Sequence, residues 1–202
     1  HVGTGQRMEQ QDIEAKLGRE IAHSLWNMGL EAVDTVRNLI LENNIECDLK
    51  YGNVHFAHKR VYCEELEEDI EFFTNRYNFN ELEYIPKKRI KEVIGSEAYY
   101  GAQWNKAALH LHPLKYALGL AKAALDAGVT IYENSRVQSY NGTPVIVKTG
   151  QGQVTASELI LACNGYIEDL EPKINGYIMP INNFVLATEP LSPEILASVV
   201  PK

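Results

Sequence analysis

Apolar residues recur at helical spacing in three segments of the chain. In residues 13–40 they follow one another at steps of three and four, which predicts a long helix. A break near Gly18 is expected within it, because glycine weakens a helix interior by about 1 kcal/mol relative to alanine. The same spacing predicts a second helix over residues 61–77. A third helix is predicted from Pro113 to Gly128. Proline suits the first position of a helix, because the N–H that it lacks would have no hydrogen-bond partner within the helix there.

Strands are predicted where apolar residues alternate or form short runs. Residues 46–58 read as a strand pair joined by a turn at residues 51–53. Residues 136–156 predict a three-stranded meander. Its first two strands are joined by an Asn-Gly turn, a sequence typical of tight hairpins. The apolar runs 129–132 and 159–162 predict two buried strands. Helices and strands thus mix along the chain, and the fold class expected is α/β (α+β).

Composition and charge exclude several classes of protein. Of the 202 residues, 45% are apolar and 23% are charged, which is ordinary for a soluble globular protein with a core. The formal net charge of −8 argues against a nucleic-acid partner or an anionic membrane, since both require concentrated lysine and arginine. No apolar run approaches the ~18–20 residues of a membrane span, and no signal peptide opens the chain.

The three cysteines, Cys47, Cys63 and Cys163, are few, odd in number and widely spaced. This usage suits a reducing compartment better than a disulfide scaffold, so we expect a cytoplasmic protein. Cys163 is accompanied by no histidine or asparagine pattern of the kind that marks a nucleophile. A small residue at the end of a buried strand is the better interpretation of it.

Two motifs are weak candidates for cofactor or metal binding. The glycines Gly3 and Gly5 resemble the start of a dinucleotide-binding loop, but Met8 stands in place of the third glycine and no strand precedes them. His110 and His112 would share one face of a strand, yet a third ligand at a recognisable spacing is missing. We therefore predict no metal site, and expect these histidines near the start of the third helix or at a pocket rim.

The predicted helix over residues 61–77 carries a run of acidic side chains. Such a run is either a cation site or a solvated helix face, and the solvated face is the more common case. The run consists of Glu64, Glu65, Glu67, Glu68, Asp69 and Glu71.

Five stretches together carry a resemblance to a known family. They are residues 47–54, 110–114, 128–137, 159–166 and 179–190. Their order and spacing resemble those of the FAD-dependent amine and amino-acid oxidoreductases of the D-amino-acid oxidase superfamily, above all the γ-glutamylputrescine oxidoreductase-like branch. The resemblance implies part of an FAD/NAD(P)-binding domain, which contains the meander, and a mixed-sheet substrate domain.

The resemblance also implies how the chain is divided between these domains. Residues 1–45 would form a helical segment of the FAD domain, and residues 46–108 would belong to the substrate domain. Residues 109–172 would return to the FAD domain, and residues 173–202 would re-enter the substrate domain.

Cofactor-binding residues follow from the same resemblance. In this family a valine after the proline-started helix holds the adenine of FAD through its backbone, and Val137 occupies that place. A small-residue turn lies beside the diphosphate-ribose portion of FAD. The residues of this chain in that turn are Ala162, Cys163, Asn164 and Gly165.

The resemblance also implies that the family uses some of these stretches around its substrate pocket. The residues that fall in them here are Tyr51, His110, Asn183 and Phe184. No catalytic base can be assigned, and an amine that enters deprotonated needs none.

The resemblance implies an enzyme that oxidises a C–N bond of a small-molecule amine or amino acid, with putrescine catabolism as one setting. A hydride would move to FAD, the resulting imine would hydrolyse, and an acceptor would reoxidise the flavin. Family members begin with a G-x-G-x-x-G unit, which would precede His1, so we expect an internal fragment that is inactive alone and binds FAD weakly or not at all. The alternatives are a non-enzymatic α+β binding module, and a glycine, sarcosine or D-amino-acid oxidase.

Overall fold

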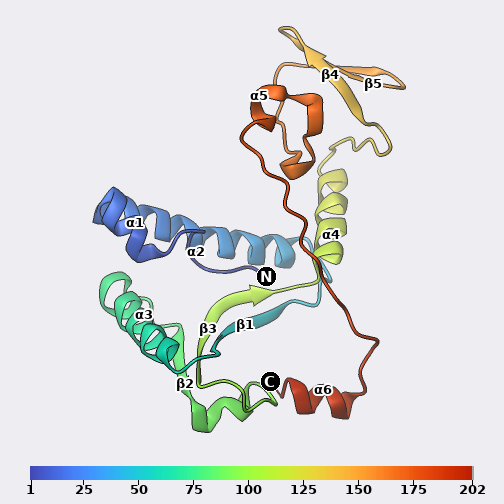
Figure 1. Cartoon of the computed structure of the whole chain (residues 1–202). Coiled ribbons are helices and arrows are strands. Elements are labelled where there is room, and N and C mark those ends of the chain that lie inside the picture. Colours follow the sequence, from blue (N-terminus) through green and yellow to red (C-terminus); the bar gives the residue numbers. More distant parts are fainter. Residues whose placement is uncertain (202) are drawn as a thin grey trace. The chain divides into compact units, whose positions relative to one another are not determined.

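The structure is a computed structural model that describes residues 1–201, and the chain forms two compact units (Figure 1). Unit 1 comprises His1–Gly128 and the segment from Pro190 onward. Unit 2 comprises Val129–Glu189. Helices and small antiparallel sheets occur together, which confirms the mixed fold class.

Unit 1 contains the predicted helices. The first predicted helix is two helices, α1 (Gln10–Leu17) and α2 (Arg19–Glu42), and the break falls at Gly18 as expected. Helix α3 (Val61–Tyr77) has the predicted bounds, and α4 (Pro113–Asp126) begins at the predicted proline. A 3₁₀ helix, η1 (Lys87–Glu92), and a terminal helix, α6 (Pro193–Val199), complete the unit. Among the helices that the structure describes, none has the length and apolar character needed to traverse a bilayer.

The sheet of unit 1 has three antiparallel strands in the order β1-β3-β2 (Figure 1). The strands are β1 (Lys50–Ala57), β2 (Leu82–Pro86) and β3 (Gly101–His110). The central strand, β3, comes last in sequence, and Val2 adds a bridge to its Leu109.

The strand pair predicted for residues 46–58 is wrong, because β1 runs straight through the predicted turn. At that point the register against β3 shifts between Tyr51 and Asn53, which makes a β-bulge. Gly52 occupies the bulge with a φ of 92°, and a Cβ there would overlap the indole of Trp104. Glycine therefore serves a bulge here and not a turn.

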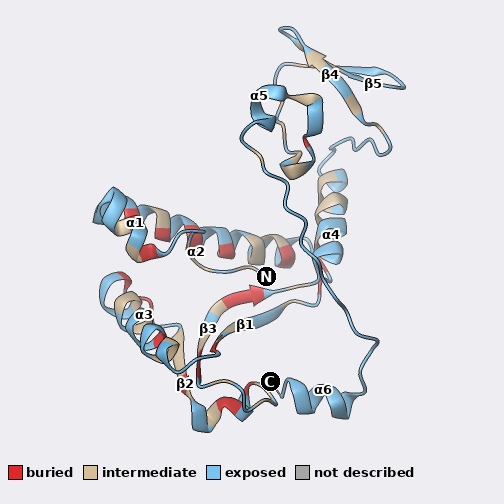
Figure 2. Cartoon of the chain, viewed as in Figure 1, coloured by how far each residue is buried: buried red, intermediate tan, exposed pale blue. Residues whose placement is uncertain are grey.

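Three apolar clusters hold unit 1 together. Ile85, Ile90 and Ala102 form one beneath the sheet, with Val93. Trp26 of α2 forms the second with Tyr77 and Phe79, which joins α2 to the end of α3. Figure 2 shows buried residues along α2 and β3, where these contacts are made.

The third cluster joins the end of α2 to α4. Ile40, Ile45 and Cys47 are buried in it, and Tyr116 packs against them from α4. The two segments approach so closely that a Cβ on Gly119 would overlap the side chain of Ile45. Glycine at this position of α4 therefore permits the close approach of Ile45.

Unit 2 contains the predicted meander, which is confirmed. Its strands are β4 (Val137–Asn141), β5 (Val145–Thr149) and β6 (Gln153–Ala156), paired antiparallel in that order. Two 3₁₀ turns follow, η2 (Asn164–Tyr166) and η3 (Glu168–Leu170), and then a one-turn helix, α5 (Pro172–Asn175).

The two buried strands predicted for residues 129–132 and 159–162 are wrong. Neither run is a strand, and large side chains in both are exposed, with Tyr132 at 68% and Ile160 at 87%. A strand requires a neighbouring strand to bond its backbone, and no described residue pairs with either run. Apolar character alone therefore does not make these segments strands.

Candidate functional site

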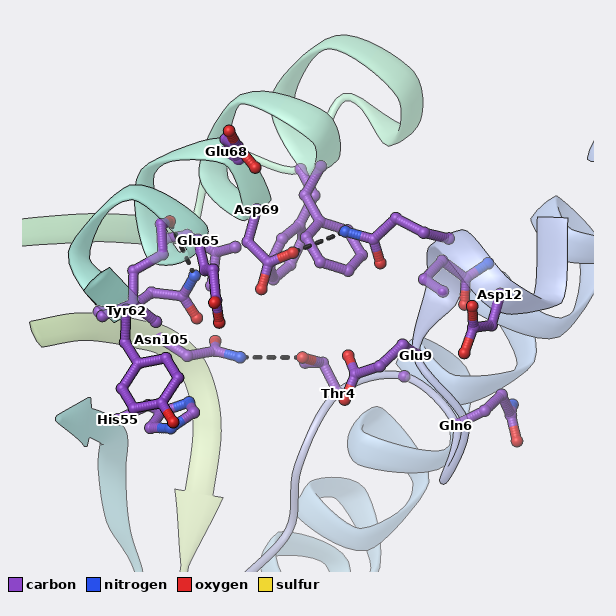
Figure 3. Close-up of a pocket in the computed structure, with 18 of the residues that line it drawn as sticks. Thr4, Gln6, Glu9, Asp12, His55, Tyr62, Glu65, Glu68, Asp69 and Asn105 are labelled. Carbon is purple, nitrogen blue, oxygen red and sulfur yellow. Dashed lines mark hydrogen bonds between the residues drawn. The ribbon is translucent and has the colours of Figure 1, made fainter. Parts of the chain in front are cut away.

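Unit 1 contains a cavity of about 720 Å³ between the chain that leads into α1, helix α3, and strands β1 and β3 (Figure 3). Its walls are mostly polar on the sides of α1 and α3. The labelled lining residues in Figure 3 are Thr4, Gln6, Glu9, Asp12, His55, Tyr62, Glu65, Glu68, Asp69 and Asn105.

The first wall is the chain before α1, which is fixed along β3. Val2 and Leu109 exchange two backbone hydrogen bonds of 2.7 and 2.9 Å. Asn105 Nδ2 donates to Thr4 Oγ1 at 2.9 Å, and Gln6 Nε2 donates to the Leu25 carbonyl of α2 at 2.8 Å. The glycine-containing start of the chain thus lies across a strand and a helix.

The second wall is α3, which polar contacts hold against α1. Gln11 Nε2 donates to Asp69 Oδ1 at 2.6 Å, as drawn in Figure 3. Arg76 pairs with Glu14 at 2.8 Å, and the Tyr77 hydroxyl donates to the same carboxylate at 3.1 Å. Burial raises the pKa of Tyr77, so its hydroxyl stays a donor at neutral pH.

Aromatic side chains form the apolar part of the cavity wall. Trp26 packs against Phe73 with ring centroids 4.7 Å apart and against Phe79 at 5.2 Å. All three line the cavity, together with Leu66 and Leu82. An aromatic surface beside carboxylates suits alkyl and ammonium groups, because π faces attract cations.

The cavity is strongly acidic. Five carboxylates line it, and no lysine or arginine does. None of the five forms an ion pair with a described residue. They are Glu9, Asp12, Glu65, Glu68 and Asp69.

Two sequence-predicted substrate residues, Tyr51 and His110, lie on neighbouring strands outside this lining. Tyr51 pairs with Leu109 and is 61% exposed. His110 Nδ1 lies 3.3 Å from the Gly52 carbonyl, so the imidazole contacts the bulge in β1. The structure brings these two residues to one end of the β1–β3 pair, and their role in substrate binding stays a prediction.

His112 is the N-cap of α4, where its Nδ1 accepts a hydrogen bond from the Lys115 N–H at 3.4 Å. This confirms the expected place of one histidine at the start of the helix. Within residues 1–201 no three His, Cys, Asp or Glu side chains are arranged to hold a metal ion.

Unit 2 has its own cavity, of about 710 Å³, and two predicted cofactor residues line it. Val137 stands at the start of β4 and Cys163 just before η2, and both are half-buried. Apolar side chains complete most of the lining, among them Leu159 and Leu161. The other residues predicted to bind the cofactor are the neighbours of Cys163 in sequence: Ala162, Asn164 and Gly165.

The residues of unit 2 fit one end of FAD better than the other. Apolar walls beside Val137 suit a flat adenine ring, and a Cβ on Gly165 would meet no atom within 4 Å, so the turn is open to a ligand. A diphosphate needs a free cation or a helix N-terminus. Arg136 pairs with Glu168, and the Glu171 carboxylate already caps α5.

Asn183 and Phe184, the other predicted substrate residues, lie in unit 2 in a segment without regular structure. Both are exposed, Phe184 at 91%. Neither residue lines the cavity described for unit 2, and their role in substrate binding stays a prediction.

Sequence reasoning missed most of the cavity in unit 1, because several segments far apart in sequence assemble it. Only the acidic run of α3 was a signal. Glu65, Glu68 and Asp69 lie at positions i, i+3 and i+4, which is one helix face, and this face lines the cavity. Glu64 and Glu71 do not line it.

Comparison with known proteins identifies the family. The sequence pattern of the DAO family, described as FAD dependent oxidoreductase, matches residues 4–201. A probable oxidoreductase, OrdL, of Haemophilus influenzae is 38% identical over 193 residues, which is 92% of this chain and 44% of that protein. Gamma-glutamylputrescine oxidoreductase of Escherichia coli is 35% identical over 192 residues, which is 94% of this chain and 45% of that protein. The chain therefore spans less than half the length of these relatives.

The fold has a counterpart among solved structures. Glycine oxidase from Geobacillus kaustophilus superposes with a TM-score of 0.63 at 18% identity, over 86% of this chain and 46% of that one. This likeness concerns the fold alone. The assignment to a family rests on the match along the sequence. With nearly all of its described residues inside that match, the chain belongs to the DAO family of FAD-dependent oxidoreductases.

Proposed function

We propose that this chain is part of an enzyme that oxidises a C–N bond of an amine or amino acid. The observation that carries the proposal is the family match over residues 4–201. The Escherichia coli relative, whose name states that it is an oxidoreductase of gamma-glutamylputrescine, supports an amine substrate. FAD, when bound, supplies the acceptor for the hydride that leaves the carbon next to nitrogen.

We propose the acidic cavity of unit 1 as the place where the amine is held. Its carboxylates attract an ammonium group, and the rings of Trp26 and Phe79 exclude water from the alkyl part. His55 and His58 also line the cavity. An imidazole nitrogen can accept a hydrogen bond from an ammonium group, and an ammonium must lose a proton before oxidation.

The remaining site assignments belong to the same proposal. In unit 2, Val137 would hold the adenine of FAD, and the turn at residues 162–165 would lie beside its diphosphate-ribose portion. Tyr51, His110, Asn183 and Phe184 would lie near the substrate. The assignment of residues 1–45 and 109–172 to the FAD domain, and of residues 46–108 and 173–202 to the substrate domain, is also proposed. The three free cysteines support a reducing compartment such as the cytoplasm.

The test is anaerobic reduction of the FAD-loaded protein, expressed from its complete coding sequence, by a panel of amines and amino acids. We expect at least one of them to bleach the visible absorbance of oxidised flavin, with ammonia or an amine as the second product. Failure of every primary amine, secondary amine and amino acid in the panel to reduce the flavin would overturn the proposal. Dithionite, which reduces accessible flavin chemically, is the positive control.

A further inference from the structure

The cavity of unit 2 lies between two segments of the chain. One wall is the meander, which contributes Val137 and Tyr140 of β4 and Val147 of β5. The other wall is the segment of residues 159–170, which contains η2 and η3. Among the residues that the structure describes, no backbone hydrogen bond joins this segment to the meander. Side-chain contacts therefore hold the two walls together.

Two polar contacts cross from β4 to the opposite wall. The Tyr140 hydroxyl donates to Glu171 Oε2 at 2.5 Å, and the guanidinium of Arg136 pairs with Glu168. Tyr140 is half-buried and lines the cavity, whereas the side chain of Arg136 is 82% exposed. Because exposed ion pairs contribute little, the bond between Tyr140 and Glu171 is the stronger candidate for holding the walls.

The Glu171 carboxylate makes a second contact at the same time. Its Oε1 accepts a hydrogen bond from the Lys173 N–H in the first turn of α5 at 3.1 Å. Hydrogen bonds from Tyr140, and then from the Lys173 N–H, lower the pKa of Glu171, so this carboxylate is ionised at neutral pH. One ionised side chain thus joins β4 to the start of α5.

The turns between the cavity and α5 have a defined shape. Ile167 lies between η2 and η3 and is only 5% exposed. The next residue, Glu168, has a φ of 47°, which is uncommon for a residue with a side chain. Such a backbone conformation persists where the surrounding contacts fix it. The wall therefore depends on its contacts with β4.

We propose that Tyr140 and Glu171 form a latch that holds the wall of residues 159–170 against β4, and that both are positioning residues for the adenine portion of FAD. The inference rests on the proposed function, under which Val137 would hold the adenine in this cavity. With the latch closed, the two walls enclose a flat ring between them. Without it, the walls separate more easily and the cofactor leaves faster.

The rates of FAD release and association test the inference, measured by flavin fluorescence in the protein expressed from its complete coding sequence. Tyr140→Phe removes only the hydroxyl. Tyr177→Phe makes the same change at a side chain that is 92% exposed and outside the cavity. We expect Tyr140→Phe to release FAD about fivefold faster, and Tyr177→Phe to stay within about twofold of the parent.

The association rate distinguishes a latch from a general loss of structure. A latch acts after the ligand has entered, so we expect Tyr140→Phe to bind FAD at the rate of the parent, within about twofold. A variant with a damaged fold would bind FAD more slowly as well. Slower association together with faster release would overturn the inference, and so would a release rate that Tyr140→Phe leaves unchanged.

Variants of Glu171 test whether the two residues act as a pair. Glu171→Ala removes both acceptor oxygens, so we expect faster FAD release and no further effect of Tyr140→Phe in that background. Glu171→Gln keeps a carbonyl oxygen that can accept from Tyr140, and should restore most of the slow release. Effects of Tyr140→Phe and Glu171→Ala that add in the double variant would contradict the inference.

The two proposals fail in different ways. Flavin that is retained and reduced by amines, but released at the parent's rate by Tyr140→Phe, would overturn the inference alone. Release that depends on the latch, without flavin reduction by any amine or amino acid, would overturn the proposed function alone. A protein that retains no flavin would overturn both.

Discussion

One carboxylate, Glu83 of β2, holds two cations from neighbouring parts of unit 1. Its oxygens lie 3.0 Å from Lys106 Nζ of β3 and 3.0 Å from Arg89 Nη1 of η1. Hydrogen bonds from Lys106, and then from Arg89, lower the pKa of Glu83 below its ordinary value of 4.5. A lowered folded-state pKa means that this stabilisation is fully present above the ordinary value and is lost as pH falls through the lowered one.

We expect Glu83→Gln to lower the free energy of unfolding at pH 7 by about 0.5–1 kcal/mol, because the two pairs are partly exposed. The difference from the parent should shrink as pH falls below the ordinary value of 4.5 and through the lowered pKa of Glu83. Urea unfolding at a series of pH values measures it. Glu81→Gln, at an exposed position just before β2, is the control. A pH-independent loss in Glu83→Gln would show that charge is not the cause.

Prediction from sequence at the scale of residues depends on how local the interaction is. His112 was placed correctly near the start of a helix, because an N-cap involves only its next few neighbours. Gln10 could not be singled out, since its partners, Ala22 and Tyr77, come from two other helices. The carboxylates of α3 were noticed, but only their position opposite Glu9 and Asp12 distinguishes the cavity face from the solvated face.

At the scale of elements, the contact between α4 and the end of α2 makes a sharp prediction about Gly119. Alanine raises intrinsic helix stability by about 1 kcal/mol over glycine, but its Cβ here would overlap Ile45. Because overpacking costs about 1–3 kcal/mol, we expect Gly119→Ala to be neutral or to destabilise by up to about 2 kcal/mol. Thermal or urea unfolding measures the change.

The same substitution in an Ile45→Ala background should stabilise the protein by up to about 1 kcal/mol, because the two overlapping γ carbons are gone. The double-mutant cycle thus isolates the contact. An equal effect of Gly119→Ala in both backgrounds would mean that Ile45 moves aside freely.

Elements differed in how well their sequences predicted them. Helix α3 has the predicted bounds because its apolar stripe and its environment agree. The central strand β3 was missed, since Ala102, Asn105 and Ala108 are weak strand formers. Small residues suit a strand enclosed by neighbours, and Ala102 and Ala108 are almost fully buried. The prediction of a strand at residues 129–132 was wrong for the opposite reason. Its sequence favours a strand, but no described residue pairs with it.

At the scale of the whole molecule, the prediction concerns FAD. The cavity of unit 2 suits the adenine end of the cofactor, whereas Glu168 already pairs with Arg136 and Glu171 caps α5. The acidic cavity of unit 1 would repel a diphosphate. We therefore expect the 202-residue chain to bind FAD weakly or not at all.

Absorbance after gel filtration with excess FAD measures this binding. One flavin retained per chain would contradict the prediction. The chain expressed from its complete coding sequence is the comparison, and should retain flavin if the proposed function holds. A flavin-free chain that unfolds cooperatively excludes misfolding as the cause.

The family could be inferred from sequence because several short stretches keep their order and spacing over most of the chain, and the match over residues 4–201 confirms it. The cavity of unit 1 could not be inferred, because its walls come from several separate segments that only folding brings together. Composition indicated an acidic protein, but not where the charges gather.

The strand order β1-β3-β2 determines when the sheet can form during synthesis. Lys50 of β1 pairs with His110 of β3, and Val2 pairs with Leu109 of the same strand. Both early segments leave the ribosome long before their partner exists, while α1, α2 and α3 need only local bonds. A nascent chain that pauses before residue 101 therefore exposes an unpaired strand, and translation through β3 is the event that completes the sheet.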